Sequence, residues 1–428
     1  MQRVFVLDAQ CRALMPCAPA RARQLLKRGR AAVYRRVPFT VILRSRTGGG
    51  VQPVALKVDP GSRTSGLALV ATFERGRDVV WAAELAHRGL AVRSALDSRR
   101  ALRRGRRSRK TRYRSPRFDN RTRPAGWLPP SLRSRVDNVA AWSRRLVGLA
   151  PLAAVAVETV RFDTQALERP GITGAEYQQG TLAGYELREY LLEHWGRACA
   201  YCGAQGVPLE VEHIHPRSRG GSDRCSNLTL ACVPCNQAKG NRDVVEHLAH
   251  DPPRLARLLA HARAPLRDAA AVNATRYACG AVLKALGLPT TFWSGGRTKY
   301  NRLGQDYPKA HWIDAACVGE DGAAVRLDPD HRPLLIAATG RGRRQVVRVD
   351  RYGFPRGRAG RVKRVHGFQT GDLVRLHQPR GKYAGVHVGR LAGIRADGRF
   401  DIATWCGKVT SVWRNFHLLQ RGDGYAYT

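Results

Sequence analysis

The sequence predicts a multidomain protein of mixed α+β and α/β architecture, in which one small module is inserted into a larger sheet-based core. Three observations predict this fold class. Strand-like runs separated by glycine turns occur near both ends of the 428 residues, two Cys-x-x-Cys pairs frame a segment in the middle, and an arginine-rich helical stretch precedes that segment. A chain of this length is enough for two to four domains.

Charge is the most unusual property of the chain. Lys and Arg number 74 against 33 Asp and Glu, which gives a formal net charge of +41 and a pI near 11.2. Such a surplus repels itself in a compact protein unless a polyanion neutralises it, and nucleic acid is the polyanion that fits best. A membrane surface fits less well, because the basic residues are spread over the whole chain.

The sequence predicts a cytoplasmic protein. The first residues, MQRVFVLDAQ, lack the apolar region of a signal peptide. No run of about 18 apolar residues is present, so no membrane span is expected. Four of the ten cysteines form the two Cys-x-x-Cys pairs and the other six are scattered, a pattern typical of a reducing compartment and one metal site.

The core begins after a small N-terminal unit. Residues 1–50 mix strand-like runs with a basic helical piece and end in a glycine run, which predicts an α+β unit followed by a linker. The next stretch, VALKVDPGSRTSGLALVAT, predicts a strand, a tight glycine turn and a second strand. Asp59 stands at the end of the first of these strands, directly before the turn.

An arginine-rich helix is predicted over residues 91–115. Eleven of the nineteen residues from Arg99 to Arg117 are Lys or Arg, and no proline interrupts until Pro116. A basic run is usually a solvated face, but a helix that is basic on every side has no core to rest on, which favours contact with phosphates. The predicted contact residues are Arg99, Arg100, Arg103, Arg104, Arg106, Arg107, Arg109, Lys110 and Arg112.

Later elements carry further acidic residues. The strand AAVAVETV has Glu158 near its end, and the helix HWIDAACVG has His311 and Asp314 three residues apart, so these two share a helix face. Taken singly, each acid is more simply a cap or a salt-bridge partner. The last hundred or so residues are short strands with glycine turns, which predicts a small, strongly basic β-barrel or sheet.

The middle segment has the spacing of a structural zinc site. Two Cys-x-x-Cys turns each place two thiolates together, and two such turns complete a tetrahedron. We expect this site to contribute folding energy and no chemistry. The four predicted ligands are Cys199, Cys202, Cys232 and Cys235.

Between the two cysteine turns lies a set of residues suited to phosphodiester cleavage. Glu212 and His213 end one strand, Asn227 precedes a second strand, and Asn236 starts a helix after the second turn. His213 can deprotonate a water, while Glu212 and Asn236 offer the hard oxygen ligands that Mg²⁺ prefers. The alternative is a zinc ribbon whose histidine merely caps a strand.

Residues 197–241 resemble the HNH endonucleases in their four-cysteine form. The resemblance implies that Glu212 and Asn236 hold one Mg²⁺, that His213 is the general base and that Asn227 braces the loop. His215 is interpreted as structural. The parts that carry Asp59, Glu158 and Asp314 resemble an RNase H-like nuclease of the RuvC type, whose clustered carboxylates bind two Mg²⁺ ions. His311 is expected to be a base or an orienting group there.

The order of these parts resembles the IscB family, compact transposon-associated relatives of the type II CRISPR effector nucleases. Further motifs that carry the resemblance are ALMP, where Ala13 replaces the first proline of the family motif, VET, GGRTKYNR and HWIDAACVG. The predicted domains are an N-terminal unit (1–50), RuvC-I (51–90), an Arg-rich bridge helix (91–115), RuvC-II with a connecting helix (116–195), the HNH nuclease with a ββα-metal fold (196–245), RuvC-III (246–325) and a C-terminal basic β module (326–428).

The resemblance implies an RNA-guided endonuclease of double-stranded DNA in a prokaryotic, nucleoid-associated setting. One large structured guide RNA would stay bound to one protein, HNH would cut the guide-paired strand, RuvC the displaced strand, and the C-terminal module would read a short motif beside the target. Two alternatives remain open from the residues. They are an unguided homing or junction-resolving nuclease, and a non-catalytic RNA-binding protein in which the acids are structural.

Overall fold

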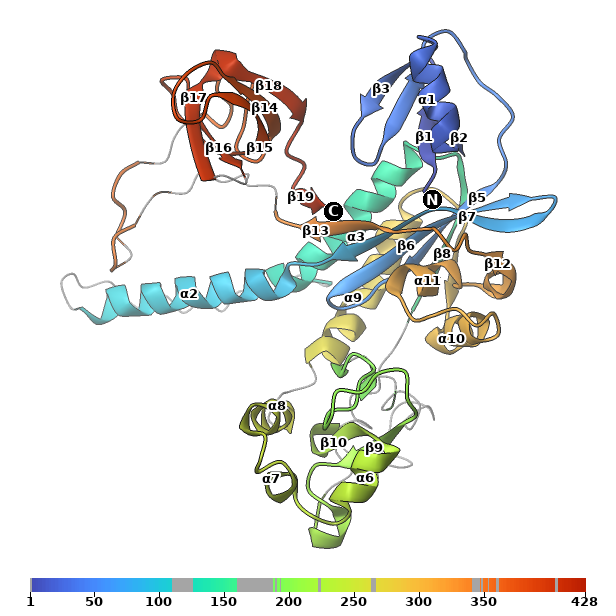
Figure 1. Ribbon diagram of the computed structural model, residues 1–428, viewed down its shortest axis with the longest axis vertical. Coiled ribbons are helices and arrows are strands. Elements are labelled where there is room, and N and C mark those ends of the chain that lie inside the picture. The colour runs from blue at the N-terminus through green and yellow to red at the C-terminus, as the bar shows by residue number, and fades with distance from the viewer. Residues whose placement is uncertain are drawn as a thin grey trace. The chain divides into compact units, whose positions relative to one another are not determined.

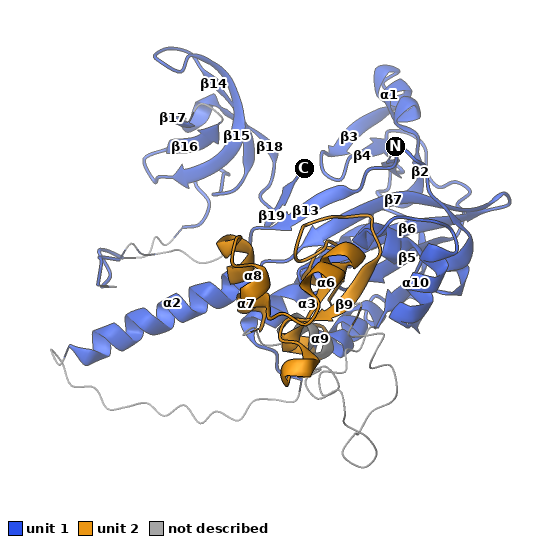
Figure 2. Ribbon diagram, turned by 60° about the horizontal axis from the view of Figure 1, so that its bottom comes forward, with its two compact units in different colours: residues 1–159, 275–428 blue, residues 160–274 orange. Residues whose placement is uncertain are grey.

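The protein forms two compact units in the computed structural model, residues 1–159 with 275–428, and residues 160–274 (Figure 2). The structure describes residues 2–109, 126–159, 188, 191–192, 194–221, 225–262, 267–340, 347, 349–352, 354–358, 362–404 and 407–428. The boundary between the two units falls within helix α9 (Arg267–Lys284).

A mixed eight-stranded sheet is the centre of the first unit (Figure 1). Its strands are β5 (Val54–Asp59), β6 (Thr64–Phe73), β7 (Gly76–Ala86), β8 (Leu152–Glu158), β11 (Thr290–Trp293), β12 (Val325–Arg326), β13 (Leu334–Ala338) and β19 (Tyr425–Tyr427). The order is β11-β8-β5-β6-β7-β13-β19, with β12 paired to β7. The strands β5, β6 and β7 form an antiparallel meander, whereas β8 runs parallel to β5 and β11 runs parallel to β8.

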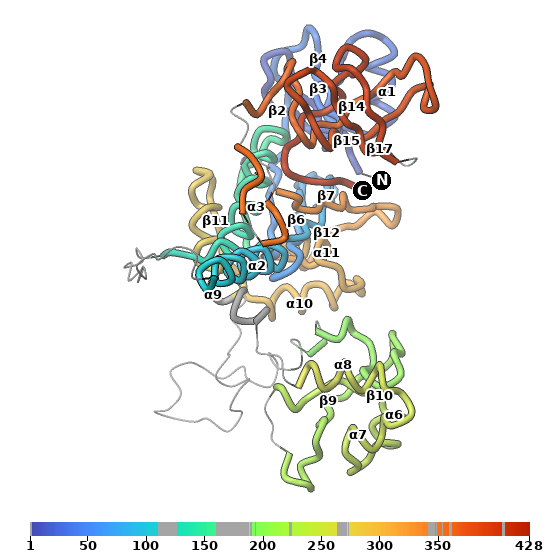
Figure 3. Tube along the Cα trace, turned by 90° about the vertical axis from the view of Figure 1, so that its left-hand side faces the viewer, coloured from blue at the N-terminus to red at the C-terminus, as the bar shows by residue number. Residues whose placement is uncertain are grey.

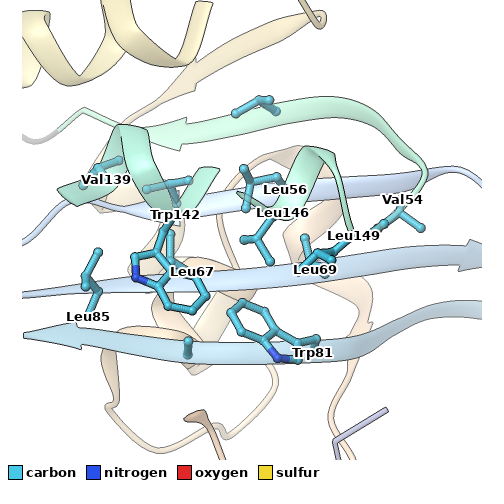
Figure 4. Close-up of a cluster of buried hydrophobic side chains, with 14 of the residues drawn as sticks. Val54, Leu56, Leu67, Leu69, Trp81, Leu85, Val139, Trp142, Leu146 and Leu149 are labelled. Atoms are coloured by element: carbon cyan, nitrogen blue, oxygen red, sulfur yellow. The ribbon is translucent and has the colours of Figure 1, made fainter. Parts of the chain in front are cut away.

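Both faces of this sheet are buried, as the nearly continuous apolar run of β6 requires. Helix α3 (Pro130–Val147) covers one face through Val139, Trp142 and Leu146 (Figure 4). Trp142 stacks on Trp81 of β7 with ring centroids 6.2 Å apart. An aromatic pair adds about 0.5–1.5 kcal/mol beyond the area that it buries, so this contact fixes α3 on the sheet.

Helix α11 (His311–Ala316) covers the opposite face, next to α10 (Gly295–Leu303) and the 3₁₀ turn η4 (Glu320–Ala324) (Figures 1 and 3). The predicted small residues Ala315 and Ala316 are fully buried there. The closest approach is made by Gly66 of β6. A Cβ atom at Gly66 would lie 1.8 Å from the backbone oxygen of His311, so only glycine allows the helix to start at this place.

The N-terminal residues form a separate four-stranded sheet of order β2-β1-β4-β3. Its elements are β1 (Val4–Leu7), β2 (Ala13–Cys17), α1 (Pro19–Lys27), β3 (Ala31–Arg35) and β4 (Thr40–Leu43). The Asp8 carboxylate accepts from the backbone N–H groups of Gln10, Arg12 and Gly48, which ties the first loop to the linker. These hydrogen bonds lower the pKa of Asp8.

The arginine-rich helix α2 spans Gly89–Ser108, and the predicted end at residue 115 lies outside the described part, because residues 110–125 are not described. None of its twenty residues is buried. Arg109, directly after the helix, stacks its guanidinium over Tyr352 and Phe354 at 4.5 and 5.0 Å from the ring centroids. A contact at its C-terminal end therefore anchors the helix, while none of its length is buried.

The C-terminal region contains a five-stranded antiparallel sheet of order β17-β16-β15-β14-β18. Its strands are β14 (Leu373–Gln378), β15 (Gly385–Ile394), β16 (Arg399–Thr404), β17 (Gly407–Val412) and β18 (Phe416–Gln420), with η5 (Trp413–Asn415) before the last. The region differs from the expected separate module in one respect. Its strands β13 and β19 belong to the central sheet of the first unit, where β13 pairs with β7 and β19 pairs with β13.

The second unit is built on a two-stranded antiparallel sheet. Its described elements are β9 (Leu209–His213), η2 (Arg217–Arg219), η3 (Cys225–Asn227), β10 (Leu228–Cys232), α6 (Val233–Lys239), α7 (Val244–His247) and α8 (Pro252–Ala262). Apolar residues of all its major elements, among them Leu230 and Leu258, form one buried cluster. Within the described ranges, no helix of the chain is long and apolar enough to cross a membrane.

We predict that Gly66→Ala destabilises the first unit by about 1–3 kcal/mol, because the added methyl group overpacks the start of α11. Urea unfolding followed by tryptophan fluorescence measures the change. Gly50→Ala is the control, since a Cβ atom at Gly50 has nothing within 4 Å. Equal stability of the two variants would contradict this account of the α11 contact.

Candidate functional site

Two predicted acids end neighbouring strands of the central sheet. Asp59 is the last residue of β5 and Glu158 is the last residue of β8. These strands are parallel, and Val58 lies opposite Val157 in the register. Parallel neighbours end at the same edge of a sheet, so the two carboxylates lie side by side.

Glu158 is held in a buried position, 8% exposed. Burial raises its pKa well above the usual value, the nearby charges of Asp59 and Asp314 raise it further, and a hydrogen bond from Thr298 of α10 opposes them. Like charges that share a dry site disfavour the ionised form of each. The nearby charge of Lys309 also lowers the pKa of Glu158, but burial and the neighbouring acids outweigh it.

Asp314 brings the third carboxylate from α11. It is 4% exposed, and burial raises its pKa, an effect that the Lys309 ammonium partly offsets. Its Oδ1 lies 2.9 Å from Arg302 Nε and its Oδ2 lies 2.6 Å from Lys309 Nζ. Electrostatic contact of Asp314 with both Asp59 and Glu158 places all three acids in one cluster.

His311 joins the cluster at the first residue of α11. Its Nδ1 lies 3.3 Å from Asp59 Oδ2, and its backbone N–H donates to Glu84 Oε1 of β7. A histidine at this place can orient Asp59 or exchange a proton with a bound water. Glu84 has no counterpart among the predicted site residues, because a mid-strand glutamate carries no sequence signal of its own.

The carboxylate oxygens of the cluster are candidate ligands for a cation. Asp314 Oδ2 is buried, and its ionic partner among the described residues is the ammonium of Lys309 at 2.6 Å. Oxygen atoms of this kind suit Mg²⁺, and the residues present fit that ion. The oxygens of the three acids do not all lie within 4.8 Å of one another. Among the described residues, only the four cysteines form a group of three or more ligand atoms this close together.

Buried basic residues position the loops around this cluster. The fully buried Lys57, two residues before Asp59, donates to Val318 O and Asp321 Oδ1, which ties β5 to the turn after α11. Arg135 of α3 donates to Pro60 O and so holds the loop after Asp59. The Lys57 ammonium and the Arg135 guanidinium are buried and need these partners, so the contacts are structural supports of the site.

In the second unit, the four predicted zinc ligands converge. The Sγ atoms of Cys199, Cys202, Cys232 and Cys235 all lie within 4.8 Å of one another. Cys202 Sγ and Cys232 Sγ are 3.7 Å apart, and tetrahedral zinc with Zn–S bonds of about 2.3 Å separates its sulfurs by about 3.8 Å. The thiol set therefore fits a structural Zn²⁺.

One cysteine of this set is already acidic. Burial opposes ionisation of the Cys199 thiol, but the backbone N–H groups of Cys232 and Cys202 outweigh it and lower its pKa to about 7. The thiolate is the form that binds metal.

Glu212 of β9 is buried, and both of its oxygens have partners. Oε1 accepts from Lys239 Nζ at 2.8 Å and Oε2 accepts from the Tyr201 hydroxyl at 2.6 Å. Tyr201 lies between two of the zinc ligands, so the cysteine turn also positions the carboxylate. A cation at Glu212 would have to share it with the Lys239 ammonium.

Asn236 and Lys239 lie three residues apart on one face of α6, and this face meets β9. Asn236 Nδ2 donates to Glu210 Oε2 at 2.7 Å, while Lys239 Nζ also donates to the backbone oxygen of His213 at 2.8 Å. Glu212 and Asn236 are thus brought to the same strand–helix interface. Glu210 was missed from the sequence, because its place in the strand is typical of a solvated side chain.

Asn227 braces the loop after His213. Its Oδ1 accepts from the backbone N–H of His215, and its Nδ2 donates to the backbone oxygen of the same residue, both at 2.9 Å. The His215 ring bonds to Asp243 through Nδ1 and to Arg219 O through Nε2. Both ring nitrogens are occupied, which supports a structural role for His215.

The predicted phosphate contacts lie on α2 where the structure describes them. Arg99, Arg100, Arg103, Arg104 and Arg107 are exposed. Arg106 and Arg109 are half-buried. Lys110 and Arg112 lie outside the described residues.

Comparisons with known proteins match two parts of the chain. Residues 199–242 match the family described as HNH endonuclease. The chain carries an HNH endonuclease domain. Residues 4–180 match the family described as RRXRR protein. Together the two matches confirm the predicted kind of protein, an HNH nuclease similar to IscB and Cas9, whose membership of IscB itself stays a prediction.

Solved structures of Cas9 also match this HNH nuclease. A type II-C Cas9 from Actinomyces naeslundii is 16% identical with a TM-score of 0.16, and the match covers 43% of this chain and 26% of that one. Cas9 from Streptococcus thermophilus in complex with the GGAA PAM is 13% identical with a TM-score of 0.19, covering 61% and 32%. The matches span about a quarter to a third of those chains. No curated protein matches the chain.

Zinc loading gives a direct test of the cysteine site. We predict that Cys232→Ser lowers bound zinc from about one ion per chain to nearly none and unfolds the HNH domain, because structural zinc supplies its folding energy. Zinc is counted by mass spectrometry of the purified protein. Cys225→Ala, a buried cysteine outside the set, should keep its zinc; equal loss from both variants would count against the assignment.

The His215–Asp243 pair predicts a pH dependence of the HNH domain. The hydrogen bond to Asp243 raises the pKa of His215 above 6.5. Its contribution to stability is complete below that value and is lost as pH rises through the folded pKa. Urea unfolding followed at Trp195 should show this loss as the pH rises above about 6.5. Asp243→Asn should flatten the profile and Glu246→Gln should keep it.

Proposed function

We propose that the protein is an RNA-guided endonuclease of double-stranded DNA, with the HNH domain cutting the guide-paired strand and the first unit cutting the displaced strand. The observation that carries the proposal is the edge of the central sheet where Asp59 and Glu158 meet Asp314. An HNH nuclease that holds a second acidic cluster in a separate unit has one centre for each DNA strand.

The strand order supports a RuvC-type first centre. Three antiparallel strands followed by two parallel ones, in the order β7-β6-β5-β8-β11, is the arrangement of RNase H-like nucleases. In such enzymes the acids stand at the ends of the first and fourth strands and on a following helix. Asp59, Glu158 and Asp314 occupy these three places.

The chain's own residues would do most of the work at both centres. Asp59, Glu158 and Asp314 would hold two Mg²⁺ ions, and Glu212 with Asn236 would hold one. Bound Mg²⁺ supplies charge neutralisation at the scissile phosphate. His213 would accept the proton of the attacking water, in a loop that Asn227 keeps in place.

Charge and the exposed helix α2 support a bound guide RNA. Seven arginines and one aspartate lie along this helix, and none is buried. The total charge of +41 exceeds what contact with one short DNA duplex would neutralise. We propose that α2 binds the guide backbone and that the C-terminal sheet reads a motif beside the target.

Strand-specific cleavage tests the proposal. With the RNA encoded beside the gene, Mg²⁺ and a supercoiled target plasmid, the wild type should cut both strands. Asp59→Ala should leave a nick in the guide-paired strand and His213→Ala a nick in the displaced strand, each slowing the lost cut by about 10²–10⁴-fold. Primer extension on each strand locates the nicks.

Glu74→Ala and His250→Ala are matched controls, since both residues are exposed in the same units and lie outside the two sites. Both controls should cut like the wild type. Nicks by both active-site variants on one strand would refute the division of labour. Cutting without RNA would favour an unguided nuclease, and retention of RNA without any Mg²⁺-dependent cutting would favour a non-catalytic RNA-binding protein.

A further inference from the structure

We propose that Lys309 is a resident counter-cation of the acidic cluster, which divalent metal displaces from Asp314, and that Lys309 thereby sets the metal affinity of this centre. The proposal rests on the proposed function, because it concerns the metal site of the first unit. It assigns a positioning role to a lysine that no motif singled out.

The geometry at Asp314 carries the proposal. Each oxygen of this buried carboxylate faces one cation, Arg302 Nε at 2.9 Å from Oδ1 and Lys309 Nζ at 2.6 Å from Oδ2. The ammonium of Lys309 therefore lies at Oδ2, on the side of the carboxylate that Arg302 leaves to it. A metal ion bound by Oδ2 and the ammonium of Lys309 would compete for one position.

The two cations differ in how firmly they are held. Arg302 has a side chain 5% exposed and also donates to Tyr307 O from Nη1, so its guanidinium is fixed from two sides. The Lys309 side chain is 29% exposed and its stem is flexible. Lys309 can therefore withdraw toward solvent while Arg302 stays.

The charge of Lys309 influences a second acid besides Asp314. Its charge also acts on Glu158, which is buried beside Asp59 and has a hydrogen bond from Thr298. An ammonium near two acids lowers the local negative potential that attracts a divalent cation. Removing the charge should therefore tighten metal binding, whereas a purely structural ion pair would change only stability.

A second buried aspartate in the same chain provides a matched control. Asp401 of β16 is 5% exposed at its side chain and pairs with Arg395 at 2.9 Å and with Lys408 at 2.8 Å. It has the same combination of one arginine and one lysine. It belongs to the C-terminal sheet, far along the chain from the acidic cluster, so Lys408→Met removes an equivalent ion pair without touching the metal site.

Manganese binding to the full-length protein, followed by electron paramagnetic resonance, tests the proposal. Mn²⁺ binding that is present in the wild type and lost in Asp59→Ala is assigned to the acidic cluster of the first unit. Lys309→Met should tighten this binding about tenfold, while Lys309→Arg and Lys408→Met should stay within about twofold of the wild type. In the His213→Ala background with guide RNA, Lys309→Met should lower the Mg²⁺ concentration for half-maximal nicking by a similar factor.

Unchanged or weaker Mn²⁺ binding in Lys309→Met would overturn the proposal, and so would equal tightening in Lys408→Met. If Lys309→Met does not fold, as judged by circular dichroism, Lys309→Gln takes its place with the same expectation. Failure of the proposed function looks different. Asp59→Ala would then remove no Mn²⁺ binding at all, whatever residue stands at 309.

Discussion

The burial of like charges at one edge of the central sheet is the constraint on which the rest of the first unit depends. Parallel pairing of β5 with β8 puts Asp59 beside Glu158, and α11 adds Asp314. Burial and the neighbouring carboxylates raise the pKa values of Glu158 and Asp314, so nearby cations are needed to keep these two ionised. Helix α10 supplies such a cation, because its Arg302 pairs with Asp314. The buried Lys57 ties β5 to the turn after α11 and so holds that turn in place.

The HNH domain also buries a carboxylate, and it stabilises that carboxylate with fewer partners. Its buried Glu212 has one ammonium and one hydroxyl as partners, from α6 and from the first cysteine turn. A domain this small has a modest apolar core, and metal-bound cysteines commonly supply the missing stability. The first cysteine turn therefore positions Glu212 through Tyr201, and the absence of a chemical role for zinc stays a prediction.

Much of the fold and of the zinc site could be predicted because the signals are local. Cysteine spacing, the strand–turn–strand around Asp59 and the arginine run each depend on neighbouring residues. Partners such as Thr298, Arg302 and Lys309 could not be predicted from their own surroundings, because only tertiary contact assigns them to Glu158 or Asp314. The strands β13 and β19 show the same limit, since pairing between distant segments leaves no pattern within either one.

Tyr201 has a consequence for how the chain would respond to oxidants. Thiolates react first when oxidised, and loss of zinc would free the turn that presents Tyr201 to Glu212. The core beneath Asp59 and Glu158 contains none of the four zinc-site cysteines. Under the proposed function, mild oxidation would disable the HNH centre first, and a protein that cuts both strands would then cut one.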